Sequence, residues 1–479
     1  MIMTSSSEII PGGRSKFWPQ WLAAATIHIL ALLCGMVGGW ASPYLAKLTA
    51  GTESLTITSA EASWIASLLH LSRPIGSIVA AGIVHKLGAR NGMLIAGVPH
   101  VVGWTCFLIK ESVPWVYASR VSGGFAMGMY LISFPHYIGE IGNEKIRGAL
   151  IALVAQGQAI GYLLGNLMGA YLSMKNFAII NLILNAIFLV SFFFFPNTAY
   201  YLVKRSKIEE AKKSLKWYNR QNDVTTELEA VKEYMGKPQK LTFKESFKRL
   251  STPLNRKTLG MVICVYLFMQ LSGIYTIAPY LEILLTTLKI NVIAPSLVVI
   301  CVSIVAVIGG LLAIYTNDHF GRRSMLAVST MGVSITFVLI GVNYLLLRNG
   351  YDISNFQWFI ITEFMMFIFF LNIGLTNIPS CLLSELFSPE LKEIGSCIAN
   401  VVCSLSAFIA TKRFQPLLDS TSEEFIFFLH AFLVFLMFVY TIIVIPETKG
   451  KTLQEIQTML MKKKKPRPIV QTHRSIEND

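Results

Sequence analysis

Charged side chains recur at fixed spacings where the apolar stretches of this chain end. Glu140 precedes Arg147 by seven residues, and Glu385 precedes Lys392 by the same interval. A carboxylate and a cation placed in this way can pair near a helix end, where one exposed pair contributes about 0–1 kcal/mol. Such weak pairs suit a contact that must form and break, so a network of them is needed to hold a conformation.

Two short strings are repeated in the same way. Gly88-Ala89-Arg90 is answered by Gly321-Arg322-Arg323, and Pro196-Asn197-Thr198 is answered by Pro446-Glu447-Thr448. All these elements recur in the same chain order, about 230 to 250 residues apart. Ordered recurrence over such a distance indicates two copies of one unit, the parallel repeat of many membrane carriers.

A third candidate for chemistry is an arginine inside an apolar stretch. Arg73 lies about halfway along the stretch 61–84, with His70 one helical turn away, and Glu363 lies in a later stretch. A central arginine in a membrane helix costs roughly 2.5–3.5 kcal/mol on insertion scales, so it requires a partner or a cavity. Arg73 therefore belongs either to a local structural network or to a ligand or gating contact.

The remaining reactive side chains do not form a catalytic pattern. The eight histidines are scattered, without metal-ligand or nucleophile–base spacing, and the seven cysteines lie within or beside apolar stretches without a Cys-x-x-Cys pair. No enzymatic activity, metal or cofactor is expected.

The elements that position these residues are membrane helices. Hydrophobic residues make up 53% of the chain and charged residues 14%, whereas soluble domains contain about 25% charged residues. Runs such as Phe192–Phe195 lack the alternation of a barrel strand, so each crossing is expected to be a helix. The apolar stretches fall near residues 20–41, 61–84, 92–110, 115–138, 148–172, 177–196, 258–286, 292–316, 324–347, 356–384, 394–418 and 424–446. The sequence thus predicts an all-α membrane protein with twelve transmembrane helices in two six-helix halves.

The net charge of +14 is distributed over alternate loops, which favours a lipid bilayer and excludes nucleic acid as the partner. Fifteen basic residues lie between Lys204 and Lys257, and eight lie between Lys449 and Arg474. The positive-inside rule places these segments, and both termini, in the cytoplasm. The opposite loops carry mainly single cations: Lys47, Lys110, Lys175, Lys289 and Arg348.

The predicted organisation follows from these spans and loops. It consists of a cytoplasmic N-terminal segment (1–19) without a cleavable signal pattern, an N-terminal half (20–203), a cytoplasmic helical linker (204–257), a C-terminal half (258–446) and a cytoplasmic tail (447–479).

Several motifs resemble the sugar-porter branch of the major facilitator superfamily, and most of all its facilitated trehalose transporter group. The resemblance covers essentially the whole chain. It is carried by Arg120-Val121-Ser122-Gly123-Gly124, Glu140…Arg147-Gly148, Pro196–Leu202, Gln270–Ile274, Asp318-x-x-Gly321-Arg322-Arg323, Pro446–Leu453, Leu69–Pro74 and Thr411–Phe414.

The resemblance implies the major facilitator fold and a cytoplasmic salt-bridge network that closes an inner gate. The first-half copy departs from the family pattern, because His85 and Ala89 stand where an acid and an arginine are usual. The expected gating residues are Glu140, Arg147, Arg90, Asp318, Arg322, Arg323, Glu385 and Glu447.

The resemblance also implies a carbohydrate site between the halves. Gln270 matches a sugar-contacting family position, Asn372 aligns with a cavity position, and Gln158 lies one turn from Ala155, where the family has its usual glutamine. Each could instead make an ordinary interhelical hydrogen bond. The candidate binding residues are Gln270, Gln158, Asn372, Tyr275, Arg73, Ser380 and Ser404.

Several cavity positions differ from those of glucose carriers. Met269, Tyr275 and Ala306 replace a glutamine and two asparagines, while Ser380 and Ser404 replace two tryptophans. Carbohydrate sites generally need an apolar face as well as polar groups, so the loss of both indoles favours a larger or different ligand.

The expected function is facilitative transport of a small carbohydrate, of the trehalose or hexose class, across the plasma membrane by alternating access. Proton-coupled sugar carriers usually have an acid near Gly39-Trp40-Ala41, and Ala41 is not one. Two alternatives remain open: a proton-coupled sugar symporter that uses His70 or Glu363, and a transport-inactive sugar sensor.

Overall fold

The computed structural model describes residues 17–236, 243–352, 354–387, 389–451, 455, 456 and 459. Most of the predicted N-terminal segment and most of the predicted tail lie outside these residues, as does the side chain of Asp318. Every regular element within the described residues is a helix.

The N-terminal half is built from seven helices. They are α1 (Trp18–Gly39), α2 (Ala41–Ala50), α3 (Ser59–Leu87), α4 (Ala89–Ile109), α5 (Val113–Ile141), α6 (Arg147–Tyr171) and α7 (Met174–Phe193).

Four shorter helices connect the halves. They are α8 (Ala199–Lys204), α9 (Ile208–Asn219), α10 (Thr225–Gly236) and α11 (Phe243–Leu250).

The C-terminal half contains two interrupted crossings. Its elements are α12 (Pro253–Gln270), η1 (Ala278–Tyr280), α13 (Leu281–Thr287), α14 (Pro295–Phe320), α15 (Arg322–Arg348), η2 (Ser354–Phe356), α16 (Gln357–Phe370), the π-helical η3 (Leu371–Leu375), α17 (Ile378–Leu386), α18 (Pro389–Ser420) and α19 (Glu423–Ile443).

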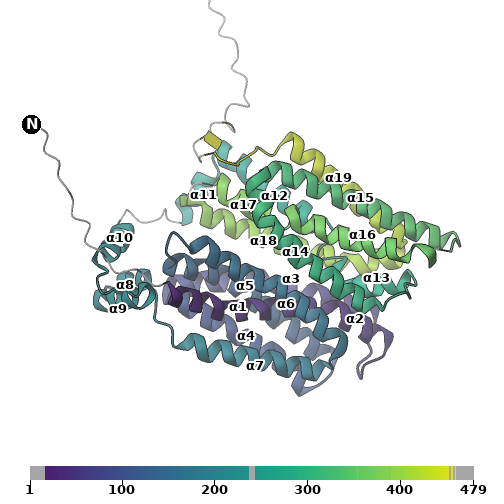
Figure 1. Ribbon diagram of the computed structural model, residues 1–479, viewed down its shortest axis with the longest axis horizontal. Helices are drawn as coiled ribbons and strands as arrows, with labels where there is room; N and C mark the ends of the chain where they lie inside the picture. Colours follow the sequence, from purple (N-terminus) through teal and green to yellow (C-terminus); the bar gives the residue numbers. More distant parts are fainter. Residues whose placement is uncertain are drawn as a thin grey trace, which may run out of the picture.

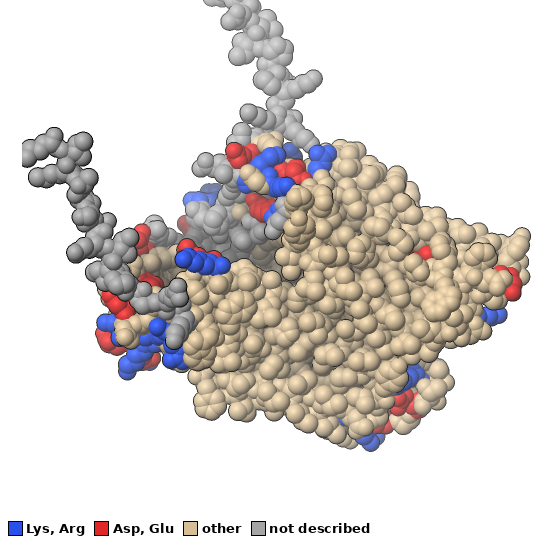
Figure 2. Space-filling model, viewed as in Figure 1, with Lys and Arg blue, Asp and Glu red and all other residues tan. Residues whose placement is uncertain are grey.

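The two halves lie side by side, with their long helices roughly parallel (Figure 1). Helices α8 to α11 lie at one end of the molecule, which we call the linker end, and α2 and α13 lie at the opposite, far end. On the face shown in Figure 2, charged residues gather at these two ends and leave an uncharged band between them. Such a band is the surface that a hydrocarbon layer requires.

Ten helical stretches among the described residues are long and apolar enough to cross a membrane. Helix α5 and the interrupted pair α12 and α13 complete the predicted twelve crossings. The first crossing is longer than expected, because Trp40 keeps a right-handed helical conformation and the apolar helical stretch continues to Ala50. Lys47 therefore lies in the last turn of α2, rather than in the loop where the sequence placed it.

Helices α3 and α5 pack with their backbones in contact. A Cβ atom at Gly124 would lie 2.1 Å from the carbonyl oxygen of Leu69, and one at Gly128 would lie 2.0 Å from that of Arg73. Small residues four apart permit this approach between membrane helices, where dispersion contacts replace the hydrophobic effect. The same packing fixes the backbone of Arg73.

Candidate functional site

Arg73 extends from α3 of the N-terminal half to α18 of the C-terminal half. Its Nε donates a hydrogen bond to Ser404 Oγ at 2.8 Å, and its Nη2 lies 3.6 Å from Cys403 Sγ. The guanidinium also lies 5.9 Å from the ring centroid of Tyr275. Only 5% of Arg73 is exposed. This side chain therefore bridges the two halves near the middle of both helices.

Two further polar side chains complete the arrangement around Arg73. Gln270 donates from Nε2 to Cys403 Sγ at 2.8 Å, and the ring of His70 packs edge-on against Tyr275 at 4.6 Å. Gln270 Oε1 and His70 Nδ1 are buried, and neither has a hydrogen-bond partner in the structure. We call these six residues the Arg73 cluster: His70, Arg73, Gln270, Tyr275, Cys403 and Ser404.

Interrupted backbone helps to place this cluster. Pro74 follows Arg73 within α3 and has no N–H, so the helix loses the hydrogen bond that would reach the carbonyl of His70. Helix α12 ends at Gln270, and Gly273 adopts φ +87°, a left-handed conformation that suits glycine. The seventh crossing is thus discontinuous beside Gln270.

Three other candidate binding residues are not part of the Arg73 cluster. Asn372, in η3, donates to the Ile368 carbonyl at 2.9 Å, and the exposed Ser380 donates to the Asn377 carbonyl at 2.8 Å. Gln158 is half-buried on α6. Within the described part of the chain, no hydrogen bond joins these three residues to the Arg73 cluster.

The repeated charged motifs of the C-terminal half meet at the linker end. Arg322 Nε pairs with Glu385 Oε1 at 3.0 Å. The two carboxylate oxygens of Glu447 accept the backbone N–H groups of Arg322 and Arg323 at 3.0 and 3.1 Å. A carboxylate is favourable there because the first N–H groups of α15 have no partner within the helix. We call Arg322, Arg323, Glu385 and Glu447 the C-half charge cluster.

The corresponding residues of the N-terminal half make different contacts. Glu140 accepts a hydrogen bond from Thr198 at 2.5 Å, while Arg147 donates twice to the Gly142 carbonyl, at 3.1 and 3.0 Å. Arg90 donates to the Phe193 carbonyl and to Asn91. Among the gating candidates, the structure joins Arg322, Arg323, Glu385 and Glu447 in one cluster.

Linker helix α9 packs onto the N-terminal half through a pair of tyrosines. The hydroxyls of Tyr137 and Tyr218 lie 2.7 Å apart, and Tyr218 donates to the Pro196 carbonyl at 2.9 Å. Burial raises the pKa of Tyr218, so its phenol stays protonated and can donate. Pro196 of the repeated motif is thereby attached to the linker.

Sequence reasoning missed the contacts at the far end. Ser63 donates to the Lys412 carbonyl at 3.0 Å, and the Lys412 ammonium lies 3.9 Å from the ring centroid of Trp64. Ser42 accepts from the Glu282 backbone N–H at 3.1 Å. All three contacts join one half to the other. Lys412 was visible in the sequence, but its partner is 348 or more residues away.

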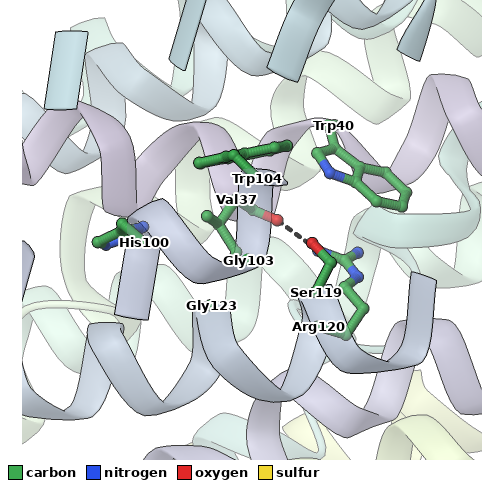
Figure 3. Close-up of a pocket in the computed structure, with 8 residues that line it drawn as sticks. All are labelled: Val37, Trp40, His100, Gly103, Trp104, Ser119, Arg120 and Gly123. Carbon is green, nitrogen blue, oxygen red and sulfur yellow. Dashed lines mark hydrogen bonds between the residues drawn. The ribbon is translucent and has the colours of Figure 1, made fainter. Parts of the chain in front are cut away.

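Arg120 is a second buried arginine, and its contacts lie within the N-terminal half. It donates from Nε to the Ile65 carbonyl at 3.0 Å and also to the Val37 carbonyl, and it lies 4.1 Å from the ring centroid of Trp40 (Figure 3). The adjacent cavity of about 10 Å³ has room for about one water molecule and is too small for a sugar. Its charge within an apolar stretch was the available sequence signal.

Among the described residues, no three His, Cys, Asp or Glu side chains lie close enough together to hold a metal ion. The chemistry that the described residues support is hydrogen bonding between the two halves and ion pairing within the C-terminal half.

A family model described as sugar (and other) transporter matches residues 29–460. The chain belongs to the sugar transporter family. The matched range includes the Arg73 cluster and the C-half charge cluster. The family match identifies a multi-pass membrane protein of a transporter family, in agreement with the resemblance seen in the motifs.

Relatives with sequence similarity are described as facilitated trehalose transporters. The one from Drosophila willistoni is 29% identical over 452 residues, and the one from Drosophila erecta is 28% identical over 451 residues. Each alignment covers 93% of this chain but only 51% and 52% of the relative. This member of the sugar transporter family thus spans about half the length of those relatives.

Solved structures establish the fold. The inward-open xylose transporter XylE from E. coli has a TM-score of 0.75 and 18% identity, and it covers 92% of this chain and 99% of its own. The proton:xylose symporter XylE bound to 6-bromo-6-deoxy-D-glucose has a TM-score of 0.69 and 19% identity, with the same coverage. The predicted major facilitator fold, with twelve helices in two halves, is confirmed.

Proposed function

We propose that this protein is a facilitative carrier of a small carbohydrate that works by alternating access in the plasma membrane. The observation that carries the proposal is the match to the sugar transporter family over 29–460, combined with a polar cluster that both halves build at mid-helix. Neutral hydroxyl, amide and thiol groups can bind a polyol without a chemical step. The trehalose transporters among the relatives support a carbohydrate as the solute.

We infer that the linker end faces the cytoplasm. Helices α8 to α11 and their cations lie at this end, where the positive-inside rule places basic loops. Helix α1 begins at this end, because Gln20 contacts Asn219 of α9 at 3.0 Å. Helix α19 ends there beside the C-half charge cluster. Both termini are therefore proposed to be cytoplasmic.

The proposed resting arrangement has its far end closed. Ser63 with Lys412, Ser42 with Glu282, and Asn166 with Ser303 at 3.0 Å join the halves there. A carrier that releases solute to the cytoplasm needs such a contact on the opposite side. Opening the far end would break these bonds, and closing the linker end would bring the C-half charge cluster toward Glu140, Arg147 and Arg90 of the N-terminal half.

Glu385→Gln should shift this balance toward an open linker end, because it removes one acid of the charge network that we propose holds this end closed in the other state. An ion pair of this exposure contributes about 0–1 kcal/mol, so the shift should be at most about fivefold. The measurement is the labelling rate of a cysteine introduced at the linker end, in a background without native cysteines.

Glu424→Gln is the matched control, because it breaks the Arg348–Glu424 pair at the far end of the C-terminal half. It should not raise labelling at the linker end. Equal labelling rates for Glu385→Gln and the parent, at equal surface level, would contradict a gating role for the C-half charge cluster.

Passive transport is the expected mode. Ala41 provides no carboxylate at the first-span position, and Glu363 is buried within the C-terminal half, where it accepts from Asn343 at 2.7 Å. In vesicles, a neutral sugar should equilibrate to the external concentration, and a protonophore should leave that level unchanged. Accumulation above the external level that collapses with the protonophore would indicate symport instead. Sugar binding without uptake would indicate a sensor.

A further inference from the structure

Arg73 is a buried cation whose described partners are all neutral. They are the hydroxyl of Ser404, the thiol of Cys403 and the ring of Tyr275. Removing an ion from water costs several kcal/mol, and neutral dipoles offset this cost less well than a counter-charge does. Within the described part of the chain, the structure thus holds a positive charge in position with no acid bonded to it.

The same cluster contains two unused polar atoms. Gln270 Oε1 can accept one or two hydrogen bonds, and His70 Nδ1 has no partner. Both residues are nearly inaccessible, at 0% and 4% exposure. Gln270 shares Cys403 with Arg73, and His70 shares Tyr275 with it, so the charge and the two unused atoms belong to one connected group of side chains.

We propose that the transported solute carries a carboxylate that binds Arg73 and a hydroxyl that donates to Gln270 Oε1. This describes an acidic carbohydrate of the uronic acid type. The inference rests on the proposed carrier function and specifies its substrate class. A carboxylate matches the planar fork of a guanidinium.

A monoanion is favoured over a phosphate ester because the cluster offers one cation. A phosphate group carries a charge of about −1.5 to −2 at pH 7, which a single guanidinium leaves partly uncompensated. A carboxylate is neutralised by it. On binding, the carboxylate would replace Ser404 or Cys403 at the guanidinium, which would also loosen the link between the halves.

The test uses the full chain, purified and reconstituted into proteoliposomes, with labelled D-glucose and unlabelled D-glucuronate, D-glucose and trehalose as competitors. A charge-assisted hydrogen bond should lower the half-inhibitory concentration of glucuronate by about 10- to 150-fold relative to glucose. Labelled glucuronate should also accumulate when a potassium gradient with valinomycin makes the lumen positive, whereas glucose should not.

Three variants separate ligand binding from structure. Arg73→Gln should remove the preference for glucuronate, and Arg73→Lys should keep part of it, because the charge remains. Lys412→Gln removes a cation from the far-end contact and should keep the preference. If Arg73→Gln yields too little folded protein, the Arg73→Lys result and the voltage response decide.

The outcomes distinguish this inference from the proposed function. If glucuronate inhibits the uptake of neutral sugars no better than glucose does, the inference is overturned and the carrier function stands. A folded protein that moves none of the three solutes would contradict the carrier function. In that case, the Tm of the purified protein decides: a rise with glucuronate alone supports the anion site, and no rise overturns it.

Discussion

Gly128→Ala should abolish most of the folded protein, although it adds a single methyl group. The new Cβ would lie 2.0 Å from the carbonyl oxygen of Arg73 and 2.8 Å from the backbone nitrogen of Ser77. Overpacking usually costs about 1–3 kcal/mol, and here the contact atoms are backbone that cannot rotate away. Helices α3 and α5 must separate, which displaces Arg73 from Ser404.

Gly139→Ala is the matched control on the same helix, because no atom lies within 4 Å of its new Cβ. Alanine is favoured over glycine in a helix by roughly 0.5–1 kcal/mol, so this variant should fold as well as the parent or better. Both are compared by size-exclusion profile after heating in detergent. Equal melting of the two variants would show that the close approach of α3 and α5 is not required.

Gln270→Ala should weaken the apparent affinity for the solute by roughly three- to a hundredfold. A buried hydrogen bond contributes about 0.5–1.5 kcal/mol, and an unsatisfied partner costs about 1–3 kcal/mol. A factor of ten corresponds to about 1.4 kcal/mol. Gln270 is fully buried, its Nε2 is used by Cys403, and its Oε1 is free to accept from a solute.

Gln357→Ala controls for the loss of a structural amide. The oxygen of Gln357 accepts the backbone N–H groups of Asn291 and Val292, both at 3.0 Å, at the far end. This variant should lower the Tm and leave the apparent affinity unchanged. Unchanged affinity in Gln270→Ala, at a normal surface level, would place the solute elsewhere and remove the basis of the family-derived cavity.

The fold was predictable because crossing a bilayer requires about twenty apolar residues per helix, and such stretches are visible in one sequence. Helix ends were less predictable. The extension of the first crossing through Trp40 to Ala50 carries Pro43 and Lys47, which are typical of a loop. The helix accommodates these residues through packing, since Lys47 donates to the Gly169 carbonyl at 2.9 Å.

The sequence predicted several residues of the site but few of the contacts between them. Arg73 could be identified from the sequence because a charge in an apolar stretch has a free-energy cost. Its partners on α18, however, are more than 300 residues away. Cys403 gave no sequence signal, although Arg73 and Gln270 meet at its sulfur. A single sequence shows which residues have a high free-energy cost in a membrane helix. Their contacts depend on tertiary packing.

The charged motifs illustrate the same limit. Glu140 and Glu385 have equivalent positions in the repeat, but Thr198 donates to Glu140 whereas Arg322 pairs with Glu385. Glu447 of the Pro-Glu-Thr string caps α15, whereas the N-terminal copy of that string, Pro196-Asn197-Thr198, has Asn197 at the position of Glu447. Bond partners diverge even where the chain order of a repeat is kept.

The most direct test of alternating access is counterflow. Proteoliposomes that contain the purified full chain are loaded with unlabelled trehalose, D-glucose or D-glucuronate and diluted into a trace of the same labelled solute, with a protonophore present. For at least one solute, the label should rise transiently above its external concentration and then decay, because unlabelled solute leaving the vesicle returns the carrier to take up label. Folded protein that gives no such rise with any of the three would contradict the carrier mechanism.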